Sequence, residues 1–542
     1  LRDRLWHSHC NHETMRWPQR IILTLLSTTA LLTCRCLGAD EPTEILGDPE
    51  FLERWRQLIE ERVPDTGWSS RLRATDLTGV DGARTYGRWS VTSENWVASL
   101  VAERDPGEKR WTDHLAGYVQ WRRGPLQVVG GSIRPGFAQG LLFGRGSGRG
   151  RGRGRQEARA FGFHSSSENQ ALRGIALKVG DRWQTAVVLA DFRRDARLDA
   201  EGNVKSLPED GLHTGPTAIN GRMQLSGGVL GLRLRHLHET GHLGIVVQNL
   251  WFDQRLKIPT RYGDDLFVGR DQMAAAMDGQ WQVGQAQMYS QVAVTSARST
   301  TWGGVAGFTN LGPRRARVSL QARLYEFGFF SPFGSSDRRW KTSNERGLYV
   351  DLRGRRWRGW YDQSIRPEPE SIPISDESME LGFEGRWRRE STQLRLDLRR
   401  RADAEWAAGQ KQIIRSARAR LQGTVTNQPY RFRALLQGHL VDDERGRSVG
   451  LDGRRRTQTH QIQLQFTWFN VSAWKARIYE YESTLPGAVA ILPLAGRGAR
   501  LNGSMRLELC GFGVAMFARR QWRRRVPTRT RIGVQIDRSS GI

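Results

Sequence analysis

Residues 461–468 read QIQLQFTW, a segment in which an apolar residue follows each uncharged polar one. Successive side chains of an extended chain point to opposite faces, so this pattern predicts a β-strand. One face would carry Ile462, Leu464, Phe466 and Trp468. The other would carry Gln461, Gln463, Gln465 and Thr467.

The same alternation continues through the chain from about residue 84 onward. It is clearest in residues 317–324, 379–388 and 394–399, where apolar residues alternate with polar or charged ones. The polar stretch 389–392 joins the last two segments and predicts a hairpin turn. A soluble β-sandwich can show this pattern, but its repetition over roughly 450 residues without a clear domain boundary favours one closed sheet.

We therefore predict an all-β fold, a transmembrane antiparallel β-barrel of about 16–22 strands with a short N-terminal helix. This number assumes roughly 20–25 residues for each strand and its connection. The apolar strand faces would contact lipid, and the faces rich in Arg, Glu and Gln would line the lumen or pack against a plug. Carboxylates that could pair with arginines in the lumen are Glu168, Glu345, Glu480 and Glu482.

The composition agrees with a barrel. Only 38% of the residues are hydrophobic and the mean hydropathy is −0.57, which excludes a bundle of transmembrane helices. The chain has 60 Gly and 20 Trp, a pairing that suits tight turns and aromatic belts at a membrane interface. We expect interfacial anchors, or alternatively a sugar-binding platform in the lumen, among Trp89, Trp96, Trp111, Trp121, Trp302, Trp357, Trp360, Trp468 and Trp474.

The formal net charge is +27, and the basic residues are mostly Arg. Such an excess favours anionic partners: outer-membrane lipid and lipopolysaccharide first, an anionic solute or polymer next, and nucleic acid as a less favoured partner. Biased codon usage in the source could also produce an Arg-rich chain, and the composition does not separate these explanations.

The N-terminal region has the pattern of an export signal. Arg16 and Arg20 precede the apolar run 21–32, and small residues follow up to Ala39. We expect cleavage after Ala39, with residues 1–14 lying upstream of the translated protein. Residues 31–34 also form a loose lipobox, in which Thr33 is a poor fit.

Three segments follow from this reading: an upstream segment and signal peptide (1–39), a periplasmic helix and linker (40–83), and the barrel (84–542). The helix is expected over residues 48–62, where apolar residues recur three and four apart. Three of the four cysteines lie within the first 36 residues, which makes a disulfide framework improbable. Cys510 is expected to be a small apolar residue of a strand.

Several segments between residues 95 and 537 carry a resemblance to a known family. They include DPGE at 105–108, FAQGLLFGRG at 137–146, NERGLY at 344–349 and RIYEYE at 477–482, with further matches at 167–176, 211–214, 485–487 and 496–498. Their order and spacing resemble the outer-membrane β-barrel regions that follow ComEA-like helix-hairpin-helix repeats in envelope proteins of Bacteroidetes-type bacteria.

The resemblance implies an outer-membrane location, no known cofactor and no catalytic residues. The chain departs from the family in one respect, because the helix-hairpin-helix repeats between signal and barrel are missing. A DNA-binding role inherited from those repeats is therefore not expected.

Two local motifs could carry further chemistry. Residues 144–155 read GRGSGRGRGRGR, which predicts a mobile cationic loop that contacts anions or polymers through Arg145, Arg149, Arg151, Arg153 and Arg155. Residues 238–242 read HETGH, a match to the zinc-protease pattern, but alternation up to His238 and then Gly241 predict a hairpin instead of the required helix. We predict no metal site, no cofactor and no enzymatic activity.

The sequence thus favours an exported protein of the outer membrane of a Gram-negative bacterium, a pore or an envelope transport or assembly component. Its Arg-rich lumen or loops would face anionic material. Two alternatives remain: a component that binds or takes up nucleic acid or a surface polymer, and a soluble secreted β-rich protein.

Overall fold

The computed structural model describes residues 66–77, 82–108, 114–145, 157–158, 161–165, 168–208, 211, 213, 215–259, 265–296, 299–313, 315–335, 344–366, 376–407, 410–488 and 490–541. The expected signal peptide, the expected helix over 48–62 and four of the five candidate arginines lie outside these residues. Those four are Arg149, Arg151, Arg153 and Arg155.

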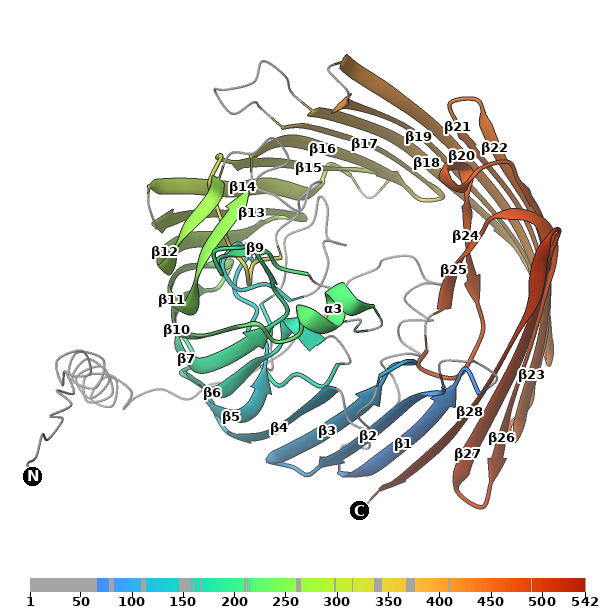
Figure 1. Ribbon diagram of the computed structural model, residues 1–542, viewed down its shortest axis with the longest axis horizontal. Helices are drawn as coiled ribbons and strands as arrows, with labels where there is room; N and C mark the ends of the chain where they lie inside the picture. The colour runs from blue at the N-terminus through green and yellow to red at the C-terminus, as the bar shows by residue number, and fades with distance from the viewer. Residues whose placement is uncertain are drawn as a thin grey trace, which may run out of the picture.

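Within the described residues, 24 antiparallel strands form one closed barrel (Figure 1). They are β1 (Gly67–Thr75), β2 (Arg84–Thr92), β3 (Trp96–Arg104), β4 (His114–Arg123), β5 (Leu126–Ile133), β6 (Leu172–Val179), β7 (Trp183–Arg194), β10 (Leu225–His238), β11 (Gly241–Pro259), β12 (Asp265–Val283), β13 (Ala286–Ser296), β14 (Thr300–Leu311), β15 (Ala316–Tyr325), β16 (Glu345–Gly354), β17 (Trp357–Arg366), β18 (Asp376–Arg389), β19 (Thr392–Ala407), β20 (Gln410–Asn427), β21 (Tyr430–Val441), β22 (Glu444–Arg456), β23 (His460–Val471), β26 (Gly496–Leu509), β27 (Phe512–Arg523) and β28 (Val526–Gly541).

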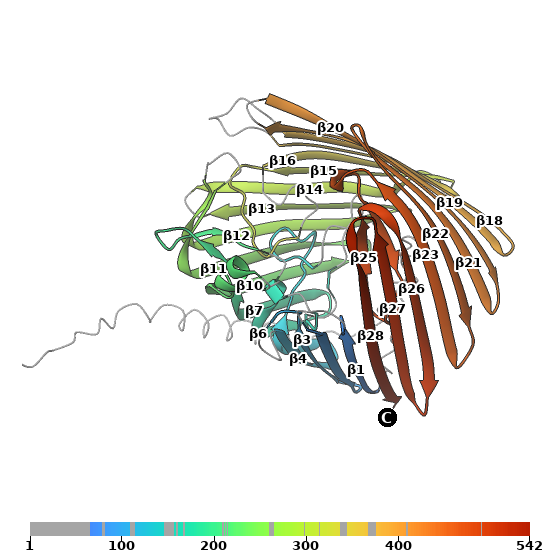
Figure 2. The same cartoon turned by 45° about the vertical axis from the view of Figure 1, so that its right-hand side comes forward.

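The barrel closes where β1 pairs with β28, in register from Gly67 opposite Gly541 to Thr75 opposite Gly533. The strands run obliquely around the wall, as closure requires (Figure 2). The predicted antiparallel barrel is confirmed. The expected 16–22 strands are too few, because many connections are tighter than the sequence estimate allowed.

The two ends of the barrel differ. At one end every connection between the described strands spans two to four residues, as in the turn between β4 and β5; β1 begins and β28 ends there. The other end carries the long connections, at 134–171, 195–224, 326–344 and 472–495. Membrane barrels commonly have short periplasmic turns and long external loops, so we refer to the short-turn end and the long-loop end.

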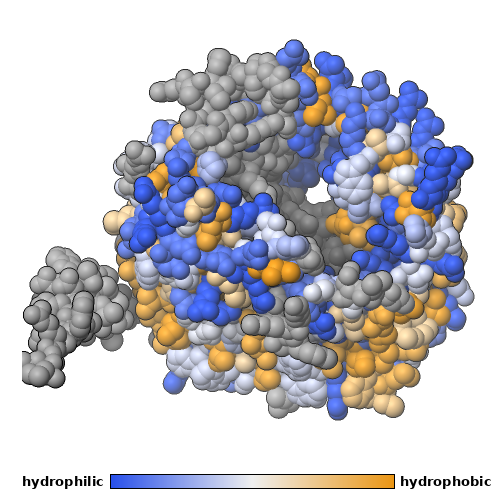
Figure 3. Space-filling model, viewed as in Figure 1, coloured by the Kyte–Doolittle hydropathy of each residue, from blue (hydrophilic) through white to orange (hydrophobic). Residues whose placement is uncertain are grey.

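The outer surface of the barrel is apolar. On β23, Leu464 is 58% exposed while its neighbour Gln465 is 4% exposed. The same division holds on β15, where Leu320 faces outward and Arg323 is buried inside. Hydrophobic residues also gather along the lower outer edge of the molecule in Figure 3. Apolar faces that point outward around a closed sheet contradict the soluble alternative, in which they would pack against each other.

Of the expected aromatic anchors, Trp111 lies outside the described residues, and seven of the others divide into two groups. Trp89, Trp96, Trp302, Trp357 and Trp468 are exposed on strands of the outer surface. Trp474, in contrast, lies in a 3-10 helix of a long connection, η2 (Trp474–Ala476), and Trp360 faces the lumen. None of the helices among the described residues is long and apolar enough to cross a membrane.

Parts of the long connections fold into the lumen. Figure 1 shows α3 (Pro216–Asn220) and the hairpin of β24 (Ile478–Glu482) and β25 (Ala490–Leu494) inside the ring of strands. The short strands β8 (Arg197–Leu198) and β9 (Val204–Ser206) and the 3-10 helix η1 (Glu168–Gln170) belong to the same connections.

Two further expectations from the sequence are wrong. The barrel begins at Gly67 and not at residue 84, because β1 is the strand that meets β28. Cys510 is not a strand residue: it is exposed in the turn between β26 and β27, where its φ is +50° and that of Gly511 is +79°. Two consecutive positive φ values suit a two-residue hairpin turn, whereas a strand residue has negative φ.

Candidate functional site in the barrel lumen

The expected cationic loop begins inside the barrel and not in solvent. Gly144 is buried, and its N–H donates to the carbonyl oxygen of Phe333 at 2.9 Å. Arg145 is exposed, but its Nη2 donates to the carbonyl oxygen of Gly162 at 2.6 Å. The expectation of a mobile loop is therefore wrong for these two residues.

The segment before Gly144 forms an apolar plug. Phe137, Leu141, Leu142 and Phe143 are each at most 1% exposed, although they lie in a connection between strands. Phe137 contacts Phe143 and Phe161 edge-on, with ring centroids 5.4 and 5.6 Å apart. On β10, Gly231 leaves room for this plug, since a Cβ there would lie 2.7 Å from the ring of Phe143.

Polar side chains of the wall hold the backbone of the plug. Gln291 on β13 accepts the N–H of Leu141 at 3.1 Å, and Gln248 on β11 donates to the carbonyl of Leu142 at 3.3 Å. From the connection between β15 and β16, Ser331 Oγ also donates to the carbonyl of Leu141, at 2.6 Å. A buried backbone group without a partner is costly, so these bonds fix the depth and register of the segment.

The connection between β15 and β16 packs beside the first. Phe329 and Phe330 are buried in the same apolar core, and the Phe330 carbonyl accepts a hydrogen bond from Gln272 on β12 at 2.7 Å. Ser335 N–H donates to the Gly140 carbonyl at 3.0 Å. The two connections together, residues 134–145 and 326–335, are called the plug below.

Burial beside the plug also affects one histidine. The ring of His164 stacks on that of Tyr118, with centroids 5.8 Å apart. Burial, together with the nearby positive charges of Arg88 and Arg145, lowers the pKa of His164 to about 4. His164 is therefore neutral at physiological pH, which limits the positive charge buried at this place.

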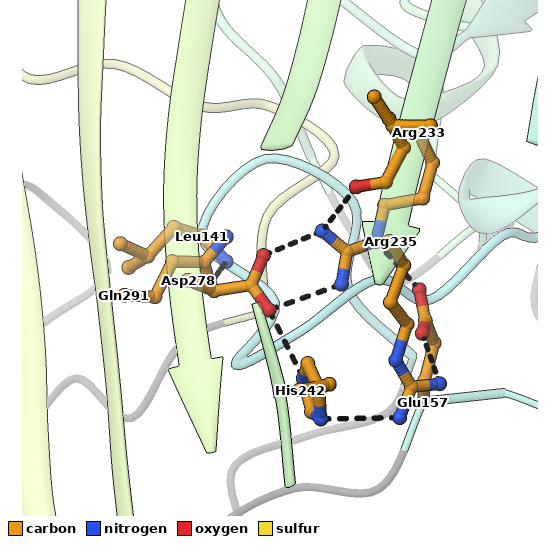
Figure 4. A network of polar contacts seen from close by, with 8 residues as sticks. Leu141, Glu157, Arg233, Arg235, His242, Asp278 and Gln291 are labelled. Atoms are coloured by element: carbon orange, nitrogen blue, oxygen red, sulfur yellow. Dashed lines mark hydrogen bonds and ion pairs between the residues drawn. The ribbon is translucent and has the colours of Figure 1, made fainter. Parts of the chain in front are cut away.

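A network of ion pairs connects Glu157, in the connection between β5 and β6, to the barrel wall (Figure 4). Arg233 on β10 lies between Asp278 of β12, at 2.6 Å, and Glu157 of the connection, at 2.9 Å. Arg235 bonds the other oxygen of Glu157 at 2.8 Å and His242 Nδ1 at 3.1 Å. Charged groups can be buried here because each one meets an opposite charge.

The HETGH residues belong to this network and to a hairpin. His238 ends β10 and lies opposite Gly241, the first residue of β11, as the sequence predicted. His238 is exposed, whereas His242 is buried and its Nε2 lies 3.2 Å from Asp278. No cluster of three metal-ligating side chains occurs among the described residues.

A third element, the β24–β25 hairpin, lies against the opposite wall. Glu482 on β24 is fully buried and pairs with Arg500 of β26 and with Arg519 of β27, the latter at 2.7 Å. Arg73 of β1 donates to the carbonyl of Pro486 at 2.8 Å. Of the carboxylates expected to pair in the lumen, Glu345 and Glu482 do so, while Glu480 accepts from Thr467 and Gln465.

A third side of the lumen is lined by arginines. On the neighbouring strands β20, β21 and β22, Leu421, Leu436 and Leu451 are exposed on the outer face. The residues that alternate with them along each strand therefore point into the lumen. The arginines at those positions are Arg418, Arg420, Arg431, Arg433, Arg454 and Arg456, and the carboxylates are Glu444 and Asp452. We call this surface the arginine wall.

Open space remains beside the arginine wall. A cavity of about 870 Å³ at the short-turn end is lined by Arg388, Arg431, Arg454 and Arg456 with uncharged polar residues and one carboxylate, Glu390. In the space-filling view along the barrel, a small opening is visible to the right of the centre (Figure 3). The plug and the hairpin thus occupy part of the lumen and leave a polar, arginine-lined part.

Trp360 marks the edge of this part. It lies on β17 opposite Gly382, with its Nε1 donating to Glu380 at 3.2 Å. The guanidinium carbons of Arg358 and Arg399 lie 5.4 and 5.3 Å from its ring centroid. The sequence could not separate Trp360 from the outward tryptophans without the register of β17 against its neighbours.

An apolar outer face and a polar lumen inside a sheet without edges are the properties that a lipid bilayer demands. The fold is that of an outer-membrane β-barrel. No model of a known protein family matches the chain, and no curated protein matches it by sequence.

Solved structures that align with the chain are also large barrels. The siderophore receptor PirA from Pseudomonas aeruginosa aligns with a TM-score of 0.44 and 10% identity, over 89% of this chain and 81% of that one. The copper transporter OprC gives 0.44 and 8%, over 89% and 81%. The translocation pore of the P pilus usher PapC gives 0.38 and 10%, over 88% and 99%. At these values no binding or transport residue is carried over to this chain.

Proposed function

We propose that this chain is an outer-membrane transport protein that passes small anionic solutes along its arginine wall, beside a plug formed by its own loops. The observation that carries the proposal is the set of arginines around the cavity at the short-turn end. The proposal places the short turns in the periplasm and assigns no enzymatic activity to the chain.

The charge of the arginine wall supports selectivity for anions. Arginine remains protonated at all physiological pH values, and a charged wall in a low-dielectric barrel concentrates counter-ions near it. Arg433 pairs only loosely with Asp452, at 3.7 Å, while Arg418 and Arg456 are exposed on the lumen side. Rings of Arg or Lys favour anions in pores by the same electrostatic effect.

The test is ion conductance of the refolded protein in a planar bilayer, with reversal potentials in a salt gradient. We expect stable steps that favour anions. The triple variant Arg431→Gln, Arg454→Gln, Arg456→Gln should lower the anion-to-cation permeability ratio at least three-fold, because it removes positive charge beside the cavity.

A matched control removes arginines from the outer face of the same region. Arg389 and Arg455 face outward at the short-turn end of β18 and β22. The double variant Arg389→Gln, Arg455→Gln should keep the native selectivity. Cation-selective steps, or equal loss of selectivity in both variants, would contradict the proposal, and so would a folded, heat-modifiable protein that conducts no ions.

A further inference from the structure

A second group of arginines lies on the outer face of the barrel, near the long-loop end. Strand pairing brings them together. One row of outward residues across β19, β20, β21 and β22 consists of Arg400, Ala417, Leu440 and Arg445. The next row contains Leu398, Ala419, Gly438 and Arg447. Arg415 of β20 faces outward one row closer to the long loops.

Between these arginines the surface is hollowed. A depression of about 710 Å³ runs across β18 to β22, and its lining is mostly apolar. Small outward residues, Ala417, Ala419 and Gly438, leave the space, while Leu381, Phe383, Leu398 and Leu440 border it. Arg400, Arg445 and Arg447 belong to the same lining.

The arginines are available for a ligand. The side chains of Arg400, Arg415, Arg445 and Arg447 are exposed, and among the described residues no carboxylate forms an ion pair with them. The nearby carboxylate of Asp442 is engaged elsewhere: it accepts the backbone N–H of Arg415 at 3.0 Å and lies 3.7 Å from Lys475 Nζ. The patch therefore has a net positive charge.

The patch lies at the edge of the lipid-facing belt. The row of outward residues below Arg447, toward the short turns, is Leu396, Leu421, Leu436 and Val449. An arginine is costly inside the hydrocarbon but stable at its boundary, where the guanidinium reaches the headgroups. A ligand matching this surface carries anionic groups above hydrocarbon chains.

We infer that this surface, the arginine patch, is a binding site for lipopolysaccharide, with the lipid phosphates on the four arginines and an acyl chain in the depression. The inference rests on the proposed outer-membrane location, with the long-loop end outward, since lipopolysaccharide occupies the outer leaflet. A guanidinium group binds phosphate with two parallel hydrogen bonds, which an ammonium group cannot do. This explains why the basic residues of the patch are arginines and not lysines. A second copy of the chain fits less well, because a two-fold contact would bring the arginines face to face.

The test compares bound lipid in two four-site variants produced in a Gram-negative host. The first carries Arg400→Gln, Arg415→Gln, Arg445→Gln and Arg447→Gln. The second removes four outward arginines at the short-turn end by Arg123→Gln, Arg389→Gln, Arg455→Gln and Arg538→Gln. After extraction from outer membranes in mild detergent, lipid A is measured by mass spectrometry, and folding by heat-modifiable migration.

We expect native protein and the short-turn variant to retain similar lipid A, and the patch variant at least five-fold less. Equal retention in all three proteins would overturn the inference. So would native protein, refolded without lipid, that binds phosphatidylglycerol vesicles as tightly as lipopolysaccharide. Absence of folded native protein from the outer membrane would instead contradict the proposed location, so the two failures are distinguishable.

Discussion

At the scale of single residues, the lumen stabilises its charges by pairing across strands. Arg323 of β15 bonds Glu345 of β16 at 2.6 Å and Asp362 of β17 at 2.7 Å, and all three side chains are buried. The planar guanidinium offers five N–H donors in fixed directions, so one side chain can satisfy acceptors on two neighbouring strands. Such a cluster connects neighbouring strands in a fixed order, and it also balances their buried charges.

Glu480 and Glu482 show how two carboxylates in one hairpin differ. Glu482 accepts from two arginines, whereas one oxygen of Glu480 accepts from Thr467 at 2.8 Å and the other, also buried, has no hydrogen-bond partner. Burial raises the pKa of Glu480, and the charge of Glu482 raises it further, although the Thr467 hydrogen bond and Arg500 act in the opposite direction.

This difference predicts opposite effects of two similar substitutions. Because the pKa of Glu480 in the docked hairpin lies above its ordinary value of 4.5, docking is strongest below that pH and weakens as pH rises through the raised pKa. Glu480→Gln should remove this pH dependence and strengthen docking at neutral pH. Glu482→Gln should weaken docking by about 3–5 kcal/mol, because it breaks a buried pair.

Hydrogen exchange of the β24–β25 amides between pH 4 and 8 measures both effects. Glu508→Gln serves as the control, since this carboxylate is exposed on β26 and, within the described part of the chain, its ion pair is with Arg506. If both hairpin variants exchange like the control at every pH, the two carboxylates do not determine docking.

At the scale of elements, the plug has an apolar core, whereas the rest of the lumen is lined mostly by polar residues. Its core continues into the wall, where Val188, Val229 and Val246 face inward at positions that are polar or charged elsewhere in the barrel. Apolar residues therefore occupy both faces of β7, β10 and β11, and the simple alternation weakens there. The wall beneath the plug is thus built as a docking surface.

We expect the plug to leave the wall when its apolar contacts are shortened. Each of Leu141→Ala and Phe143→Ala should cost about 2–5 kcal/mol, because both side chains are fully buried. The double variant should lose hydrogen-exchange protection in residues 137–144 and conduct more current per channel, while the barrel stays heat-modifiable.

The control for the plug variant truncates outward leucines. Leu243 and Leu501 are both more than 40% exposed, so Leu243→Ala, Leu501→Ala should leave plug protection and conductance at native values. Native conductance in the double variant, despite lost protection, would mean that the plug does not limit the current.

At the scale of the whole molecule, closure depends on contact between the first and last strands. Leu72 of β1 and Ile536 of β28 lie directly opposite each other and both face outward. Opposite residues of an antiparallel pair have Cα atoms about 4.5–5.5 Å apart, which lies within the range that a disulfide bond spans.

Leu72→Cys with Ile536→Cys, in a Cys510→Ser background, should therefore form a disulfide in the folded protein. The control pair, Leu72→Cys with Ile532→Cys, is displaced by four residues, roughly 13 Å along the strand, and should stay reduced. Migration on a non-reducing gel separates the products. Efficient crosslinking of the displaced pair, or none of the opposite pair, would contradict this register.

Much of the barrel was predictable from the chain, and the candidate site was not. The alternation in 461–468 predicted the outward face of β23, and Gly241 predicted the hairpin after His238, because both are properties of neighbouring residues. Arg145 was recognised as a candidate, but its place at the end of a plug segment was missed. The buried FAQGLLF stretch before it was a usable signal, since seven largely apolar residues do not form a solvated loop.

Local alternation of polar and apolar residues determines that this chain forms strands and which face of each meets lipid, because that pattern depends only on the two-residue period of an extended backbone. Strand order, closure and the path of the long connections depend on contacts between residues hundreds of positions apart. Only the folded barrel brings Arg431 beside Arg454, Arg400 near Arg445, and Leu141 against Gln291, so only the tertiary structure determines where the lumen is open and where the proposed lipid site lies.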